Sequence, residues 1–136
     1  MGIYQQLESD FDYEIVEEFL GHYTIMVESM DRLIVNLKDP ACYSNNINEL
    51  FRMFHTIKSA SAYLHITPVH KLVTLGEDVL EECRNIKGAA SDDLINWLLL
   101  ISEQLTLYKE DLELDHDNFS KLNTKIIKIP TNYLRS

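Results

Sequence analysis

Apolar residues recur every three or four positions in four segments of the chain, a spacing that predicts four amphipathic helices. The first segment begins near Ser9 or Asp10, either of which can cap a helix. It ends before Pro40, because a proline ring stops a helix that reaches it from the N-terminal side. Its apolar positions, expected to face the core, are Ile15, Phe19, Met26, Met30, Leu33 and Leu37.

The second helical segment is expected to begin after a polar cap supplied by Ser44, Asn45 or Asn46 and to reach about Leu64. One side of this helix is apolar except at a single serine. We call this side the inner stripe, and it consists of Ile47, Leu50, Phe54, Ile57, Ser61 and Leu64.

The third and fourth segments have clearer boundaries. Thr67 is the expected N-cap of the third helix, and Pro68 occupies its first helical position. Lys87 suits the negative end of the helix dipole, and Gly88 is predicted to end the helix in a left-handed conformation. The fourth helix is expected to start at Ser91. Its apolar positions are Leu94, Leu98, Ile101, Leu105, Tyr108 and Leu112.

Short connections between these segments favour antiparallel neighbours. The predicted fold is therefore all-α, an antiparallel up-down four-helix bundle over residues 1–116. Residues 117–136 contain Pro130, carry no acidic residue after Asp117, and are expected to form a short extra helix within 117–127 followed by a tail or linker. We expect a monomer, since the four apolar stripes can cover one another within one chain.

Charge and composition narrow the classes of function. The chain has 12 Lys and Arg against 22 Asp and Glu, a net charge of -10, which disfavours binding to nucleic acid or to an anionic membrane surface. No apolar run approaches the roughly 18 residues of a membrane helix, and the N-terminus does not resemble a signal peptide. We therefore expect a cytoplasmic protein without membrane insertion, in which Cys42 and Cys83 are reduced thiols and Cys83 lies in the core.

His55 lies one step off the inner stripe of the second helix, about 100° around the helix axis. It is therefore expected at the surface of the bundle. Its neighbours one or two turns away are Phe51, Arg52, Lys58, Ser59 and Ala62. On composition alone, a histidine beside a lysine is most simply part of a solvated face.

The nearest carboxylate that could face His55 comes from the third helix. Residues 50–76 contain no Asp or Glu, although they contain three of the five histidines. From His55 to the turn is about ten residues, or roughly 15 Å. Ten residues along the returning helix is Glu77, so antiparallel packing is expected to bring Glu77 level with His55.

This arrangement suits phosphoryl transfer through a histidine. A carboxylate that accepts a hydrogen bond from Nδ1–H leaves Nε2 free as a nucleophile. Lys58, one turn away, can neutralise an incoming phosphoryl group, and the small side chains of Ser59 and Ala62 leave room for a partner. A solvated surface histidine remains the alternative on these residues alone.

Two stretches of sequence resemble histidine phosphotransfer (HPt) domains, above all the N-terminal domain of chemotaxis (CheA-like) kinases. "HTIKSASAYLHITP" (residues 55–68) is similar to the family signature, and "EEFLGHYTIMVESMDRLIVNL" (residues 17–37) resembles its first helix. The similarity covers about residues 9–115. It implies that His55 is the phospho-acceptor, that Lys58 stabilises the phosphoryl charge and that Glu77 orients His55. Ser61 and Leu64 also match.

The sequence departs from the family pattern at two places. Ser59 and His65 stand where the family usually has glycine, so the turn after the second helix must close without the conformational freedom of glycine. Gly76, beside Glu77, lowers helix propensity. We interpret it as a residue for close helix packing rather than as room for a partner.

The resemblance implies a phosphorelay carrier. It would exchange a phosphoryl group between His55 and the aspartate of a response-regulator receiver domain, and would also meet a histidine kinase catalytic domain. Phe51, Arg52, Ser59 and Ala62 would form the contact surface. We expect no cofactor, since no glycine-rich phosphate motif is present and Mg²⁺ would come with the receiver. No metal site is expected, because His22, His70 and His116 have no second His or Cys three or four residues away.

Two alternatives stay open at this point. The domain can be one part of a multidomain CheA-like sensor kinase. It can also be a module that docks on receivers or kinases without being phosphorylated.

Overall fold

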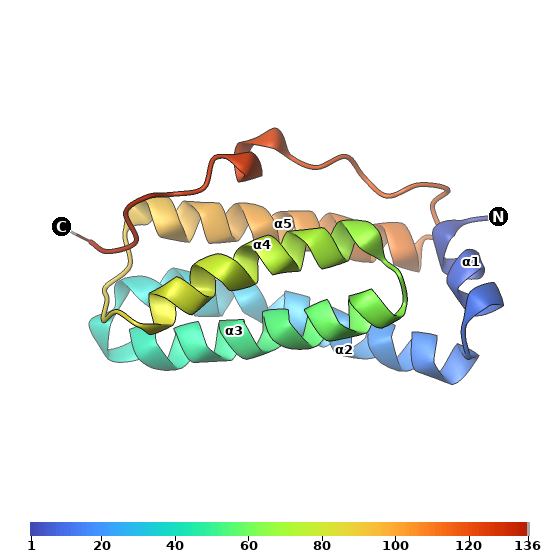
Figure 1. Ribbon diagram of the computed structural model, residues 1–136, viewed down its shortest axis with the longest axis horizontal. Helices are drawn as coiled ribbons and strands as arrows, with labels where there is room; N and C mark the ends of the chain where they lie inside the picture. The colour runs from blue at the N-terminus through green and yellow to red at the C-terminus, as the bar shows by residue number, and fades with distance from the viewer. Residues whose placement is uncertain (136) are drawn as a thin grey trace.

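The computed structural model describes residues 1–135 as a bundle of four long helices with a short helix at one end (Figure 1). The long helices are α2 (Tyr13–Val35), α3 (Pro40–Tyr63), α4 (Thr67–Arg84) and α5 (Asp92–Glu113). The short helix is α1 (Ile3–Asp10), and two 3-10 turns are η1 (Asn36–Lys38) and η2 (Thr124–Ile127). The all-α four-helix prediction is confirmed. Within residues 1–135 the sole β feature is an isolated bridge between Ala90 and Leu134.

Core positions were predicted for three of the four long helices, and in two of these helices all of them are buried. All six residues of the inner stripe of α3 and all six predicted positions of α5 are buried. In α2 the buried side is shifted, because Ile15 is exposed while Val16 and Tyr23 are buried. Cys83 is buried as expected, and burial raises the pKa of its thiol to about 12. Both cysteines are free.

The start of the first long helix was predicted wrongly. Ser9 and Asp10 belong to α1, a separate helix, and the chain turns at an extended Phe11 before α2 begins. The N-cap of α2 is Asp12, whose side chain accepts a hydrogen bond from the Glu14 amide. The helix α1 depends on a distant residue, since Asp115 Oδ1 accepts hydrogen bonds from the first-turn amides of Tyr4 and Gln5. Sequence periodicity does not reveal such a contact.

The beginning of α3 also differs from the prediction. The preceding helix α2 ends at Val35, well before Pro40, and Pro40 instead opens α3 at a position where its missing N–H costs nothing. Asp39 caps the helix by accepting a hydrogen bond from the Ala41 amide. The polar residues 44–46 therefore lie inside α3, which begins more than one turn earlier than expected.

Both predicted boundaries of α4 are wrong, whereas the predicted start of α5 is confirmed. The predicted left-handed role of Gly88 is wrong: α4 ends at Arg84, and no glycine among residues 1–135 has a positive φ. Gly88 is instead required by packing, because a Cβ atom there would lie 2.3 Å from the Tyr43 ring. The predicted N-cap role of Thr67 is also wrong: Thr67 is the first residue of α4, and Ile66 occupies the cap position without a side-chain hydrogen bond. Ser91 caps α5 as predicted, accepting from the Leu94 amide.

The C-terminal segment runs back along α5 toward the connection between α4 and α5 (Figure 1). Ile126 is fully buried, and the indole of Trp97 donates to its carbonyl at 2.9 Å. The short helix expected within residues 117–127 is the 3-10 turn η2. The division of the chain at residue 116 stays a prediction. No helix within residues 1–135 is long and apolar enough to span a membrane.

Asp111 of α5 connects this helix to the start of the C-terminal segment through hydrogen bonds. The residue is only 3% exposed, and its carboxylate accepts hydrogen bonds from His116 Nδ1, the Ser120 amide and the Ser120 hydroxyl. Burial acts to raise the pKa of Asp111, but these three bonds to its charged form outweigh burial and lower the pKa below the ordinary value of 3.8.

Replacing Asp111 with asparagine is expected to lower the free energy of unfolding at neutral pH by about 2 kcal/mol, because the amide cannot accept all three bonds. A carboxyl group whose pKa is lowered by folding stabilises the folded state at pH values above its ordinary pKa. This stabilisation is lost as the pH falls through the pKa of the group in the folded protein. The difference between native protein and variant is therefore expected to be constant above about pH 5 and to shrink below 3.8. Urea unfolding of both proteins over this pH range measures it. A difference that does not vary with pH would contradict the assignment.

Candidate functional site

His55 lies on the surface of the bundle where α3 faces α4. Its side chain is 60% exposed, while the adjacent Phe54 and Ile57 of the same helix are fully buried. The helix thus turns its apolar stripe inward and leaves the imidazole in solvent, as the spacing predicts. The other side chains that the sequence places around it are also at the surface: Arg52, Ser59 and Ala62 are exposed, and Phe51 and Lys58 are partly buried.

Glu77 of α4 meets His55 at the predicted level. Glu77 Oε1 lies 3.3 Å from His55 Nδ1. A carboxylate only accepts hydrogen bonds, so Nδ1 must carry the proton in this contact. The neutral ring then keeps its free lone pair on Nε2, the nitrogen that does not face Glu77.

The second oxygen of Glu77 faces Lys58. Glu77 Oε2 is 3.5 Å from Lys58 Nζ, and it is fully buried without a hydrogen-bond partner. The ammonium group is therefore the polar group that compensates for its burial. Only 12% of the Glu77 side chain is exposed. One oxygen of its carboxylate contacts His55, and the other contacts Lys58.

Gly76 allows α3 and α4 to approach closely at this level. A Cβ atom on Gly76 would lie 2.3 Å from Cε2 of the buried Phe54 ring. Phe54 precedes His55, and Gly76 precedes Glu77, so this contact controls the separation of the two functional side chains. The interpretation of Gly76 as a packing residue is confirmed.

Phe51, which the sequence places one turn before His55, stacks beside the imidazole. The two rings are 6.2 Å apart between centroids and inclined by 15°. The guanidinium group of Arg84 lies over the Phe51 ring, 4.2 Å from its centroid. Arg84 was missed by sequence reasoning, although a signal existed. The antiparallel register that pairs His55 with Glu77 also pairs Asn48 with Arg84, and Arg84 Nε donates to Asn48 Oδ1 at 3.1 Å.

The turn after α3 closes with a non-glycine residue in the left-handed region. His65 has φ 56°, and the Ile66 amide donates to the Ser61 carbonyl at 2.9 Å, as in a Schellman motif. Histidine tolerates this conformation less well than glycine. The turn therefore has the same geometry that the family glycine would provide, at some cost in stability.

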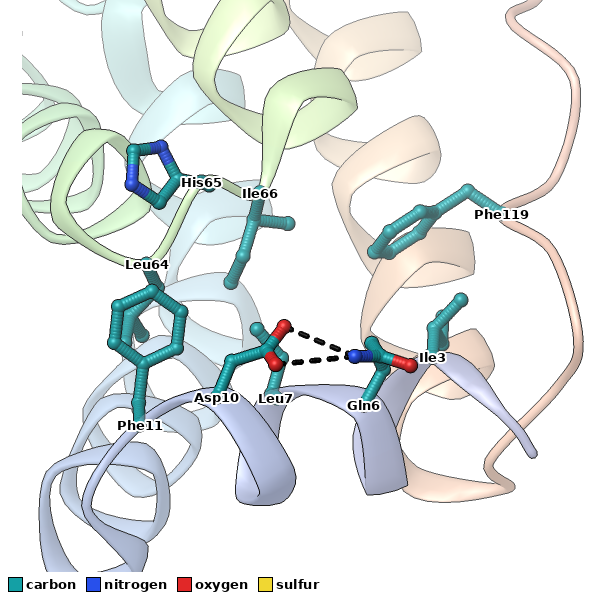
Figure 2. A pocket seen from close by; sticks show the side chains of 9 residues that line it. All are labelled: Ile3, Gln6, Leu7, Asp10, Phe11, Leu64, His65, Ile66 and Phe119. Carbon is teal, nitrogen blue, oxygen red and sulfur yellow. Dashed lines mark hydrogen bonds between the residues drawn. The ribbon is translucent and has the colours of Figure 1, made fainter.

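The site is an open surface rather than a cavity. A hollow of about 400 Å³ lies instead between α1, the α3–α4 turn and Phe119 (Figure 2). It is mainly apolar, and the side chain of Gln6 donates hydrogen bonds to Asp10 at its rim. None of His55, Lys58 and Glu77 lines it. Among residues 1–135, no cluster of three or more His, Cys, Asp or Glu side chains is arranged to hold a metal ion.

Comparison with known proteins identifies the family. The sequence profile of the Hpt domain matches residues 14–117. The chain is 31% identical over 110 residues to the chemotaxis protein CheA of Borreliella burgdorferi, covering 81% of this chain and 12% of that protein. It is 31% identical over 86 residues to the sensor histidine kinase CheAY of Helicobacter pylori, covering 63% and 11%.

The chemotaxis protein CheA of Salmonella typhimurium is 24% identical over 110 residues, covering 78% of this chain and 16% of that protein. The chain thus spans a small part of the length of these relatives, and no solved structure matches it. The match of the Hpt profile extends over all four long helices of the bundle and includes His55, Lys58 and Glu77. The chain therefore belongs to the Hpt domain family, the histidine phosphotransfer carriers of two-component signalling.

Proposed function

We propose that His55 accepts a phosphoryl group on Nε2 and exchanges it with the aspartate of a response-regulator receiver domain. The observation that carries this proposal is the contact between Nδ1 and Glu77 on a ring that is 60% exposed. It assigns the proton to one nitrogen and leaves the other available to a partner. A histidine kinase catalytic domain is the proposed original donor.

In the transfer step the lone pair of Nε2 attacks phosphorus. The bond between phosphorus and the donor oxygen breaks, and the donor leaves with that electron pair. Positive charge then develops on the imidazole ring, which keeps its proton on Nδ1. The Glu77 carboxylate, 3.3 Å from that nitrogen, balances this charge, and the same steps in reverse return the phosphoryl group to a carboxylate.

Lys58 is the proposed partner of the phosphoryl oxygens. Its side chain is 34% exposed and already lies beside the site through Glu77. Phe51, Arg52, Ser59 and Ala62 are the proposed contact surface for the receiver, which would supply Mg²⁺ and its own acidic pocket. The carrier itself would need no cofactor. We further propose that it works as a cytoplasmic monomer that binds no nucleic acid.

Intact mass spectrometry after incubation with phosphoramidate tests the proposal without a protein partner. Nε2 would displace ammonia from phosphorus, so the expected result is one phosphoryl group per chain. It should be lost on mild acid treatment, as a phosphoramidate linkage requires. If neither phosphoramidate nor a histidine kinase catalytic domain phosphorylates the protein, and it still binds a receiver, it is a docking module and the proposal is wrong.

Replacing Lys58 with alanine is expected to slow phosphorylation by phosphoramidate about tenfold, and to leave a measurable rate, because one neutralising charge is lost while the nucleophile remains. The initial rate of adduct formation by intact mass measures this effect. Lys71→Ala is the matched control, since it removes an exposed lysine of α4 outside the site and is expected to change nothing. Equal rates for both variants would exclude a role of Lys58 in the transfer.

A further inference from the structure

Few protein contacts restrain the imidazole of His55. The side chain is 60% exposed, and its polar contact to Glu77 has a length of 3.3 Å, at the long end for a hydrogen bond. One such bond defines which nitrogen of the ring faces α4, but it does not fix the plane of the imidazole ring. Phosphoryl transfer needs the Nε2 lone pair aligned with phosphorus, so a second restraint on the plane of the ring matters.

Phe51 supplies a restraint of this kind. It lies one turn before His55 in α3, and the two rings are nearly parallel at 15° with centroids 6.2 Å apart. A parallel neighbour one turn away favours one plane of the imidazole over others. Phe51 is itself only partly buried, so the restraint is effective only where its own ring is held.

Arg84 holds the Phe51 ring from the neighbouring helix. Its guanidinium carbon is 4.2 Å from the ring centroid, in cation–π contact. The guanidinium is in turn fixed by two 3.1 Å bonds, from Nε to Asn48 Oδ1 and from Nη1 to Glu81 Oε2. Asn48 precedes Phe51 by about one turn and His55 follows it by about one turn, so the phenyl ring lies between guanidinium and imidazole along α3.

We propose that Arg84 and Phe51 are positioning residues for phosphoryl transfer: Arg84 holds the phenyl ring, and the phenyl ring sets the plane of the His55 imidazole. This inference rests on the proposed function of His55. It assigns Phe51 a role within the carrier itself, whereas the sequence suggested only contact with a partner. It also gives a role to Arg84, which stands 29 positions after His55 in the sequence.

A small-molecule donor separates positioning from docking. Phosphoramidate needs no docking surface, so replacing residues that serve only to bind a receiver would leave the rate of its reaction unchanged. Replacing positioning residues would lower that rate. Arg84→Met keeps an apolar stem but loses the charge and both hydrogen bonds, and Phe51→Leu keeps apolar volume but loses the ring. Both single variants are expected to react about fivefold to tenfold more slowly.

The double variant shows whether Arg84 acts through Phe51. If it does, Phe51→Leu with Arg84→Met reacts no more slowly than Phe51→Leu alone, because without the ring the arginine has nothing to hold. Phe51→Tyr keeps the ring and is expected to restore the native rate. Arg32→Met removes an exposed arginine of α2 and serves as the control, with an unchanged rate.

Nuclear magnetic resonance of the unphosphorylated protein gives a readout that is independent of transfer. In Arg84→Met the ring-current shifts of the His55 imidazole protons are expected to change, because the phenyl ring loses its fixed place. Native rates with phosphoramidate in Arg84→Met, or additive losses in the double variant, would overturn the proposal. So would unchanged imidazole shifts. If the native protein were not phosphorylated at all, the proposed function would fail, while the imidazole shifts would still decide whether Arg84 positions the ring.

Discussion

Replacing His55 with glutamine is expected to abolish phosphorylation of this protein, whether the donor is phosphoramidate or a histidine kinase. Glutamine can still form a hydrogen bond with Glu77, but the lone pair of its amide nitrogen is delocalised and does not attack phosphorus. The side chain at this position is 60% exposed, so the free energy of unfolding is expected to stay within about 0.5 kcal/mol of the native value. Intact mass and acid lability measure the loss.

His22→Gln is the matched control for this experiment. His22 is an exposed histidine of α2, outside the α3–α4 face, and its replacement is expected to leave phosphorylation unchanged. A native level of labelling in His55→Gln would show that another side chain is the acceptor, and the proposed function would be wrong for His55. Loss of labelling in both variants would point to a defect other than loss of the nucleophile.

Replacing Gly76 with alanine is expected to affect both stability and transfer. The added Cβ atom would lie 2.3 Å from Cε2 of Phe54, a ring that is fully buried and has little space to move. Relieving this overlap requires α3 and α4 to separate, at a cost of about 1–3 kcal/mol in the free energy of unfolding. Separation also draws Glu77 away from His55, so the rate with phosphoramidate is expected to fall about tenfold.

Gly21→Ala provides a control for which the expected change in the free energy of unfolding has the opposite sign. Gly21 lies inside α2, and a Cβ atom there would meet nothing within 4 Å. The same substitution is therefore expected to stabilise the protein by about 1 kcal/mol through helix propensity alone, without affecting transfer. Urea unfolding and initial phosphorylation rates of the two variants test the contrast. Similar stabilisation by both would mean that the Phe54 ring gives way and that Gly76 does not control the approach of the helices.

Much of the site could be predicted from the sequence because helix geometry is regular. A residue one step off a buried stripe must face outward, which placed His55 correctly. A constant rise per residue in two antiparallel helices joined by a short turn brings Glu77 level with His55, and the observed contact of 3.3 Å agrees with this. The fourth helix was equally clear, since Ser91 and the regular apolar spacing after it define its start without help from other elements.

The errors arose where one residue type has two structural uses. Proline ends a helix or begins one, and Pro40 begins α3, whereas α2 already ends at Val35. Glycine allows positive φ or close packing, and Gly88 is used for packing against Tyr43. The correct choice depends on what lies opposite in space, which a local pattern does not contain.

The sequence by itself therefore determined the four helices, the inner stripe of α3, the exposure of His55 and its level with Glu77, because these follow from periodicity within one or two neighbouring helices. Tertiary structure alone decided the contacts between distant segments. Asp115 caps α1, and residues 124–127 pack on Trp97. These contacts depend on side-chain directions and on the path of the chain after α5, and no periodic signal in the sequence records either.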